Sequence, residues 1–388
     1  MERESHAGEA VAVNVEGLLT TCAGQAEALR RYADGLRAAA ADVGTTTLLI
    51  GDLLPGAELE LLPGPERVDR EPSRNPDVNL IGINGLEMWG LVALRGDEYL
   101  QERPAVGIWA WETDEVPDRM FEHAELLDEI WVYSNYVSDN LSPHTATPVV
   151  TMPIPLPLDQ PPKGRAPDLP DGFRFLFSFD FLGTVRRKNP EGVVSAFSEA
   201  FSPGEGPQLI LKAMNGGLRP DEKRSLLETI GDRPDITLLD EALRPGDHAE
   251  LFRRCDCYVS LHRSEGFGLT LAEAMSLGMP AVATGWSGNT DFMTAENSYL
   301  VDFELTRVGE GAEHYPADGT FAEPDLEQAA ALLREIWLNP DDAHRRAERG
   351  RADVRANLAA DVVGAAARGR LEALRKQPGV AVQRRPVS

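Results

Sequence analysis

The stretch SLHRSEGFGLTLAEAMSLGMPAVAT, residues 260–284, carries the strongest signal in the chain. A buried strand is predicted to end at Leu261, and a helix is predicted to begin near Leu269. Gly266 and Gly268 lie in the loop between them, where glycine lets the backbone approach a ligand closely. The amides at a helix start and the positive end of its dipole suit a diphosphate. The stretch therefore predicts an anion-binding turn in an α/β domain.

Two carboxylates flank this turn. Glu265 lies in the loop, and Glu273 lies eight residues later within the predicted helix. Carboxylates only accept hydrogen bonds, so a pair of them suits the paired hydroxyl groups of a sugar or a ribose. Solvated acids on a surface helix are the alternative interpretation.

The rest of the chain alternates short apolar runs with helical stretches, which predicts doubly wound parallel sheets. We expect strands at 11–15, 46–50, 78–84, 105–111, 129–134 and 148–152, and again at 173–179, 208–214, 236–240, 256–261 and 280–284. Helical patterns occupy 25–41, 189–201, 220–230, 269–277 and 324–376.

A change of composition divides the chain. Residues 151–172 contain seven prolines, which interrupt helices and sheets, so this stretch is the predicted linker. The 388 residues exceed the size of one ordinary core. We predict one domain over 1–155, a second over 156–360, and a final helix that crosses back to the first domain, with a loose tail, over 361–388. Ligands bind beyond the carboxyl ends of such strands, so the cleft between the domains is the expected site.

Basic residues precede a second predicted helix start. In SFDFLGTVRRKNPEGVVSAF, residues 178–197, Arg187 and Lys188 come directly before an N-cap asparagine. Such a pair can hold a diphosphate, and a solvated basic turn is the alternative. Lys212 ends another predicted strand, where it could add to the phosphate site or only cover the sheet edge. His262 and Arg263 border the glycine loop, where a structural role is expected for the histidine.

The segment EGFGLTLAE, from Glu265 to Glu273, resembles the retaining glycosyltransferases of family 4, which have the GT-B fold of two Rossmann-like domains. The resemblance implies that Glu265 contacts the donor sugar and Glu273 the nucleotide ribose. It places the intervening Gly266, Phe267, Gly268 and Leu269 around the donor. It also extends to the loop at 285–292, where the candidates for sugar contact are Ser287, Gly288 and Asn289.

The resemblance assigns phosphate-binding residues in both domains. The family usually has an arginine several residues before its lysine. Lys188 matches the lysine, but the usual arginine position holds Leu182 or a neighbour, so Arg186 or Arg187 would take that role. The loop after the first strand faces the donor phosphates in the family, which assigns Gly17 to the donor site.

The acceptor side is predicted in GIWAWETDEVPDRM, residues 107–120. Family members often place a histidine or an acid near the reacting carbon of the sugar here. The segment has no histidine, so Glu112 is the catalytic candidate. We interpret Trp109 as a residue of the hydrophobic core. For Trp111, core packing is the alternative to acceptor binding. The candidates for acceptor binding are Trp111, Glu112, Asp114 and Glu115.

The implied reaction is sugar transfer from a nucleoside diphosphate sugar, UDP being favoured over GDP, with retention of the anomeric configuration. The leaving phosphate would help to take the acceptor proton. No D-x-D motif occurs, so we expect neither a metal nor another cofactor, with Arg187, Lys188 and helix amides stabilising the departing diphosphate. The alternatives are a sugar-nucleotide epimerase or phosphorylase with the same fold, and a non-catalytic carbohydrate-binding protein.

Charge narrows the range of partners. The net charge of −25 argues against nucleic acid. Residues 1–155 carry −17 and no lysine, whereas membrane-bound acceptors usually go with a basic face. We therefore expect a soluble small-molecule acceptor, and the acids would suit a cationic one such as an aminocyclitol.

Features that the sequence lacks bear on the cellular location of the protein and on disulfide or zinc cross-links. It has neither a long apolar run nor an apolar signal core, so we expect no membrane span and a cytoplasmic location. Three cysteines without a C-x-x-C pair predict neither a disulfide framework nor a zinc site. No residue pattern bears on the oligomeric state.

Overall fold

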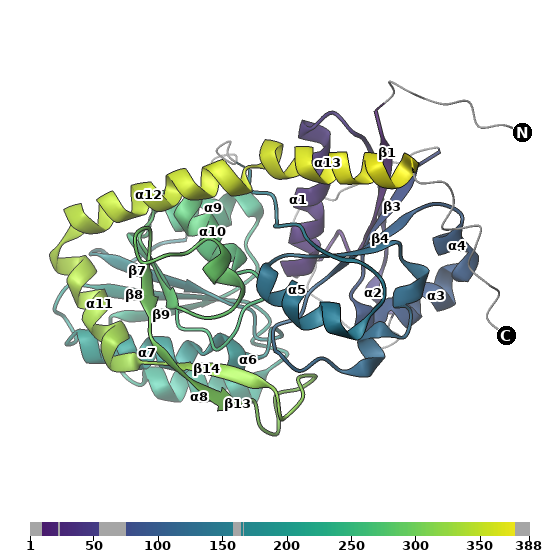
Figure 1. Cartoon of the computed structure of the whole chain (residues 1–388). Helices are drawn as coiled ribbons and strands as arrows, with labels where there is room; N and C mark the ends of the chain where they lie inside the picture. Colours follow the sequence, from purple (N-terminus) through teal and green to yellow (C-terminus); the bar gives the residue numbers. More distant parts are fainter. Residues whose placement is uncertain (1–9, 22–23, 54–74, 158–163, 166, 377–388) are drawn as a thin grey trace, which may run out of the picture.

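The chain is described by a computed structural model over residues 10–21, 24–53, 75–157, 164–165 and 167–376. Two sheets of six parallel strands form two domains that lie side by side, with the first in purple and blue and the second in teal and green (Figure 1). The predicted α/β architecture of two Rossmann-like domains is thereby confirmed. Among the described residues, no helix combines the length and the apolar character needed to cross a membrane.

The first sheet has the order β2-β1-β3-β4-β5-β6. Its strands are β1 (Ala12–Gly17), β2 (Asp42–Thr47), β3 (Val78–Gly82), β4 (Ala105–Trp109), β5 (Glu129–Val132) and β6 (Val149–Thr151). The helices are α1 (Gly24–Ala38), α2 (Ile50–Leu53), α3 (Met88–Arg95), α4 (Asp97–Gln101) and α5 (Asn135–Leu141). Short 3-10 helices are η1 (Gly85–Glu87), η2 (Asp118–Phe121), η3 (Ala124–Leu126) and η4 (Ser142–His144).

One predicted strand of this domain is misplaced. The apolar residues 48–50 predict a strand at 46–50, but β2 occupies Asp42–Thr47 and a helix begins at Ile50. β2 lies at the edge of the sheet, where it pairs only with β1, and its threonines suit a half-exposed strand. Leu48 instead packs into the core beyond the strand end.

The second sheet has the order β12-β11-β10-β7-β8-β9. Its strands are β7 (Arg174–Ser178), β8 (Gln208–Ala213), β9 (Ile236–Asp240), β10 (Cys257–Ser260), β11 (Ala281–Thr284) and β12 (Tyr299–Val301). The helices are α6 (Val185–Lys188), α7 (Pro190–Ala200), α8 (Pro220–Ile230), α9 (Pro245–Arg253), α10 (Leu269–Ser276) and α11 (Leu326–Leu338), with η5 at Gly288–Asp291. Because β7, β10 and β11 are neighbours, the loops that follow them meet at one edge of the sheet.

A hairpin of the second domain reaches the first domain. It consists of antiparallel β13 (Phe303–Arg307) and β14 (Thr320–Pro324) with their connection, and we call residues 303–324 the strap. Tyr315 and Phe321 of the strap belong to the same apolar cluster as Trp111 of the first domain. The Asp114 carboxylate accepts bonds of 2.7 Å from both the amide and the hydroxyl of Thr320. The strap therefore holds the two domains together beside the cleft.

The chain crosses between the domains a second time through its last helices. α12 (Pro340–Leu358) packs on α10, and α13 (Ala360–Lys376) packs on α1 of the first domain, as the yellow helices in Figure 1 show. Leu156, in the first crossing, donates to the Leu358 carbonyl at 2.7 Å and accepts from the Ala360 amide at 2.9 Å. The two segments that cross between the domains, at Leu156 and at the junction of α12 and α13, are thus hydrogen-bonded to each other.

Two glycines allow α13 to lie close to α1. A Cβ atom added at Gly364 would overlap the carbonyl oxygen of Gly35, and one added at Gly35 would lie 3.2 Å from the Ala360 carbonyl oxygen. The two helix backbones are therefore in direct contact, and any side chain at Gly364 has to separate them.

We expect Gly364→Ala to lower the free energy of unfolding by about 1–3 kcal/mol, because a well-packed interface cannot accept an added methyl group. Gly369→Ala is the matched control on the same helix, since nothing lies within 4 Å of a Cβ there. It should stabilise the chain by roughly 0.5–1 kcal/mol through helix propensity. Urea denaturation of both variants measures the difference, and equal stabilities would show that the helices do not pack as described.

Candidate active site

The cleft between the domains has a volume of about 1420 Å³. It is bordered by the start of α1 and the segment after β4 on one side, and by the loops after β7, β8 and β10 on the other. The predicted site residues that line it are Trp111, Glu112, Arg187, Lys188, Lys212, Glu265, Gly266, Phe267, Gly268, Leu269 and Glu273.

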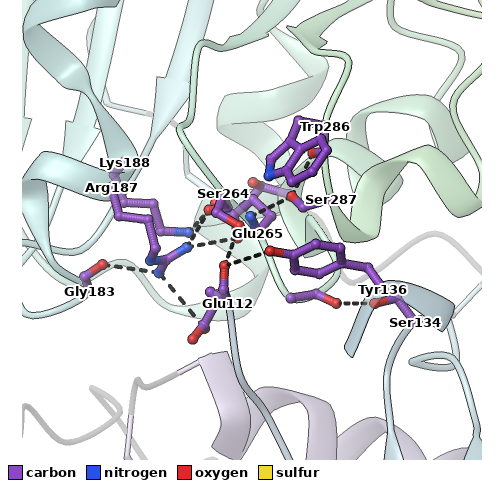
Figure 2. A network of polar contacts seen from close by, with 12 residues as sticks. Glu112, Ser134, Tyr136, Gly183, Arg187, Lys188, Ser264, Glu265, Trp286 and Ser287 are labelled. Atoms are coloured by element: carbon purple, nitrogen blue, oxygen red, sulfur yellow. Dashed lines mark hydrogen bonds and ion pairs between the residues drawn. The ribbon is translucent and has the colours of Figure 1, made fainter. Parts of the chain in front are cut away.

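An ion pair between Glu265 and Lys188 lies at the centre of the site. The Lys188 Nζ atom is 2.5 Å from Glu265 Oε1, and Figure 2 shows the two side chains pointing toward each other. Burial alone would raise the pKa of Glu265, but Lys188 and Arg187 outweigh it and hold the pKa at about 2. Burial lowers the pKa of Lys188, an effect that Glu265 opposes. Both residues of the pair line the cleft.

Arg187 connects this pair to the first domain. Its guanidinium donates to the carbonyl oxygens of Ser264 at 2.8 Å and Gly183 at 3.0 Å. It also lies 3.4 Å from Glu265 Oε2 and 3.9 Å from Glu112 Oε1 (Figure 2). Burial favours loss of the charge, yet the surrounding oxygens raise the pKa of Arg187 above its ordinary value. Arg186 is exposed and bonds to Glu310 outside the cleft, so Arg187 is the arginine that reaches the site.

The loop that carries Glu265 is fixed from both domains. The Glu265 amide donates to Ser287 Oγ at 2.8 Å, and the Gly288 amide donates to the Glu265 carbonyl at 2.9 Å. From the first domain, the Ser134 hydroxyl donates to the Gly266 carbonyl at 2.7 Å (Figure 2). Ser287 and Gly288 thus act on Glu265 from behind, and neither lines the cleft.

Gly268 occupies the N-cap of α10 with a φ of +87°, in the left-handed region that favours glycine. Phe267 and Leu269 line the cleft beside it, and the Phe267 ring packs on Phe292 at 5.2 Å. Asn289 lies fully buried behind this turn, where its amide donates to the Thr284 carbonyl at 3.1 Å. The structure therefore keeps Asn289 out of the cleft.

Glu273 contacts a residue that sequence reasoning missed. Arg31 of α1 forms an ion pair with Glu273 Oε1 across the cleft. The same guanidinium lies 2.7 Å from a carboxylate oxygen of Glu27. Burial would raise the pKa of Glu27, but Arg31 and Arg30 outweigh this effect and hold the pKa at about 2. Arg31 lies four residues after Glu27, which predicts their pairing, but nothing in the sequence indicates the contact with Glu273.

Lys212 is a buried cleft residue. Its ammonium group donates to the Ala213 carbonyl at 2.8 Å, and it lies near enough to Asp180 to act on that carboxyl electrostatically. Burial nevertheless raises the pKa of Asp180 above its ordinary value. A positive charge is therefore present on the second-domain side of the cleft, beyond Lys188.

The acceptor candidates separate into two groups. Glu112 faces Arg187, and its Oε2 atom accepts a 2.7 Å bond from the Tyr315 hydroxyl. Trp111 is packed against the Tyr315 ring with centroids 5.2 Å apart, and its Nε1 donates to the Glu115 carbonyl. Asp114 and Glu115 are exposed and do not line the cleft, because Asp114 is engaged by the strap.

Three further residues considered in the sequence analysis, Gly17, Trp109 and His262, have structural surroundings. Gly17 does not line the cleft: a Cβ there would meet the Leu29 side chain at 2.5 Å, so the glycine lets α1 pack on the sheet. Trp109 is fully buried in the first-domain core, as predicted. His262 is fully buried too, and burial lowers its pKa to about 4, which leaves the imidazole neutral.

Glu87, which the sequence did not single out, also lines the first-domain side of the cleft. It lies in η1, which follows β3. Ligand sites lie beyond the carboxyl ends of such strands, so its position after a buried strand could have indicated a place in the cleft. Burial raises its pKa to about 7, although a bond to its own amide and the nearby Arg119 act in the opposite direction.

The described part of the chain holds no group of three or more His, Cys, Asp or Glu side chains placed to bind a metal ion. Cys255 and Cys257 are buried thiols without a disulfide, and Cys22 lies outside the described residues.

Comparison with known proteins finds a similarity in the second domain. Residues 181–353 match the family model of the Glycosyl transferases group 1, and this match contains Lys188, Glu265 and Glu273. The finer assignment to family 4 stays a prediction.

One curated relative and two solved structures show the extent of this likeness. D-inositol 3-phosphate glycosyltransferase of Segniliparus rotundus is 29% identical over 111 residues, which is 28% of this chain and 24% of the relative. Anabaena Alr3699/HepE, in complex with UDP and glucose, has a TM-score of 0.64 and 12% identity, over 93% of this chain and all of HepE. The pneumococcal O-GlcNAc transferase GtfA, in complex with UDP and GlcNAc, has a TM-score of 0.54 and 15% identity.

The match with GtfA covers 76% of this chain and 56% of GtfA. The chain therefore spans about a quarter of the curated relative and about half of GtfA. Its likeness to HepE extends over nearly the whole chain, and the GT-B fold expected from the sequence is confirmed.

The raised pKa of Glu87 predicts a pH-dependent stability. Above pH 7 the carboxyl is ionised in both states, and its burial penalises the folded state, whereas below about pH 4.5 it is neutral in both. Stability should therefore fall as the pH rises between these values.

We expect Glu87→Gln to be more stable than the unchanged protein at pH 8, and this gain to shrink at pH 5, in urea denaturation. Glu122→Gln, which alters an exposed carboxyl of the same domain, should show neither effect. An equal gain from Glu87→Gln at both pH values would contradict the shift.

Proposed function

We propose that the chain transfers a sugar from a UDP-sugar to a soluble small-molecule acceptor, with retention of the anomeric configuration and without a metal ion. The observation that carries this proposal is the ion cluster of Lys188, Arg187 and Glu265 in the cleft, within the segment that matches the group 1 family model. Glu273 lies in the same cleft, at the position that the motif assigns to the ribose.

The donor would occupy the second-domain side of the cleft. Glu265 would exchange its bond to Lys188 for hydroxyl groups of the sugar, and Lys188 would then face the diphosphate. Arg187 is held by carbonyl oxygens and stays in place, so the positive charge exists before the leaving group departs. Such a preorganised charge can stabilise the departing diphosphate without a metal. The UDP complexes of HepE and GtfA support UDP as the nucleotide.

The acceptor would occupy the first-domain side. Glu87 and Glu112 line that side, and their carboxyl groups support an acceptor that presents hydroxyl or ammonium donors. Glu112 lies nearest the cluster, which supports a role beside the reacting carbon. The leaving phosphate would help to take the acceptor proton, and we assign no enzymatic nucleophile.

The first experiment is thermal unfolding with UDP, GDP, ADP and dTDP in turn, with EDTA present throughout. A nucleotide that binds only the folded state stabilises it by about 2.7 kcal/mol at 100 times its Kd. We expect UDP to raise the melting temperature, and Glu273→Gln to lose most of that increase because the ribose loses its carboxylate partner. Glu323→Gln, on the strap, is a control that leaves the cleft lining unchanged.

Other outcomes distinguish the alternatives. A shift that appears only without EDTA would show that a metal is needed. Sugar phosphate formed only with added inorganic phosphate would indicate a phosphorylase, and a UDP-sugar altered at one carbon would indicate an epimerase. Binding without any turnover would leave a carbohydrate-binding protein, and an inverted anomeric centre, read by NMR of the product, would overturn retention.

The ion pair between Arg31 and Glu273 predicts competition with the nucleotide. The ribose hydroxyls need the carboxylate whose Oε1 atom Arg31 holds, so we expect donor binding to compete with this pair. We expect Arg31→Met to bind UDP more tightly, by roughly 5-fold, which corresponds to about 1 kcal/mol.

Calorimetric titration with UDP measures the effect, and Arg37→Met, also on α1 but outside the cleft lining, is the control. Weaker UDP binding by Arg31→Met would show instead that Arg31 contacts the nucleotide.

A further inference from the structure

The strap brings a tyrosine of the second domain to the acceptor-side carboxylate of the first. Tyr315 lies in the connection between β13 and β14, and its hydroxyl donates to Glu112 Oε2 at 2.7 Å. The other oxygen of the same carboxylate lies 3.9 Å from Arg187 NH2. Both of these partners of the Glu112 carboxylate therefore come from the second domain, although Glu112 itself follows β4 of the first.

The ring and the hydroxyl of Tyr315 have separate surroundings. The side chain is 6% exposed, and its ring packs against Trp111 and His314 with centroids 5.2 Å and 4.3 Å apart. The contact with Trp111 anchors the strap in the apolar cluster of the first domain. The hydroxyl points away from that packing, toward Glu112. Removing the oxygen alone therefore leaves the anchor intact.

The Tyr315 hydroxyl keeps its proton and so remains a donor. Burial raises the pKa of Tyr315 well above its ordinary value, and Glu112 adds to this effect while Arg187 opposes it. A hydrogen bond to an ionised carboxylate is among the stronger bonds in proteins. Such a bond fixes the direction of the carboxylate as well as its place.

The main chain of Glu112 is held independently. Its carbonyl oxygen accepts bonds from the hydroxyls of Ser264 and Tyr136, the latter at 3.4 Å (Figure 2). These bonds fix where the residue sits, but they leave its side chain able to rotate. Tyr315 and Arg187 act on the side chain.

We propose that Tyr315 is a positioning residue for the proposed sugar transfer, which orients the Glu112 carboxylate toward Arg187 and the donor end of the cleft. This inference rests on the proposed function. It adds that the acceptor-side carboxylate is aligned by the donor domain, through a strap that the sequence motifs do not contain. Tyr315 touches Glu112 in this role and need not touch the substrate.

The test is Tyr315→Phe in the full-length chain, assayed by release of UDP from UDP-glucose and from UDP-GlcNAc with a panel of small polyol and aminocyclitol acceptors. Loss of a bond to a charged group, with misplacement of the carboxylate, should lower kcat by roughly 10-fold to 100-fold. The KM for the UDP-sugar and the melting shift with UDP should stay within about 2-fold of the unchanged protein, because the donor side is untouched.

Tyr136→Phe is the matched control, because it removes a hydroxyl that contacts the same residue at its main chain rather than its carboxylate. It should keep kcat within about 2-fold. A second comparison places Tyr315→Phe in a Glu112→Gln background. If Tyr315 acts through Glu112, the second change should cost almost nothing beyond the first.

Three results would overturn the proposal. One is a kcat for Tyr315→Phe equal to that of the unchanged protein. Another is a loss that adds fully to that of Glu112→Gln. The third is a lowered melting temperature with weaker UDP binding, which would show a purely structural role. Failure of the unchanged protein to bind UDP or turn over any UDP-sugar would instead refute the proposed function itself, and this inference with it.

Discussion

Arg187 is a cation that the fold buries almost completely, with 4% of its surface exposed. A buried charge is tolerated only when polar partners surround it. Here the partners are two carbonyl oxygens, of Gly183 and Ser264, and two carboxylates, of Glu265 and Glu112. They come from the loops after β7 and β10 and from the segment after β4. The need to enclose one guanidinium therefore fixes loops of both domains relative to each other.

This arrangement gives the two neighbouring cations different tasks. Both terminal nitrogens of Arg187 donate to carbonyl oxygens of the protein, so this residue serves the framework of the site. Lys188 is 20% exposed and pairs with Glu265 at the surface of the cleft, where a ligand can reach both. Ser287, Gly288 and Ser134 hold the Glu265 loop from behind, so this ion pair can open without the loop moving. The proposed donor site thus combines a rigid charge with an exchangeable one.

The sequence predicts most of the fold, because continuous apolar runs are typical of parallel strands, and it placed β1 and β3–β11 close to where they lie. Glu265, Lys188 and Lys212 could be assigned to one cleft, since the carboxyl ends of neighbouring strands converge. The strap could not be predicted, because β13, FELTR, has only five residues and is largely exposed. The pair of Arg31 with Glu273 joins residues 242 positions apart, and the pair of Tyr315 with Glu112 joins residues 203 apart. Both depend on how the domains face each other, which local patterns do not encode.

The junction of α12 and α13, which is hydrogen-bonded to Leu156, lies at the top of Figure 1, and β13 and β14 of the strap lie at the bottom. Because both chain crossings meet at Leu156, this point is the natural pivot for any rotation of one domain against the other. A rigid rotation displaces atoms in proportion to their distance from its axis. The strap lies on the opposite side of the domain boundary from this pivot, so a small opening angle would part Tyr315 from Glu112. Closure of the two halves and formation of the Tyr315–Glu112 hydrogen bond would then occur together.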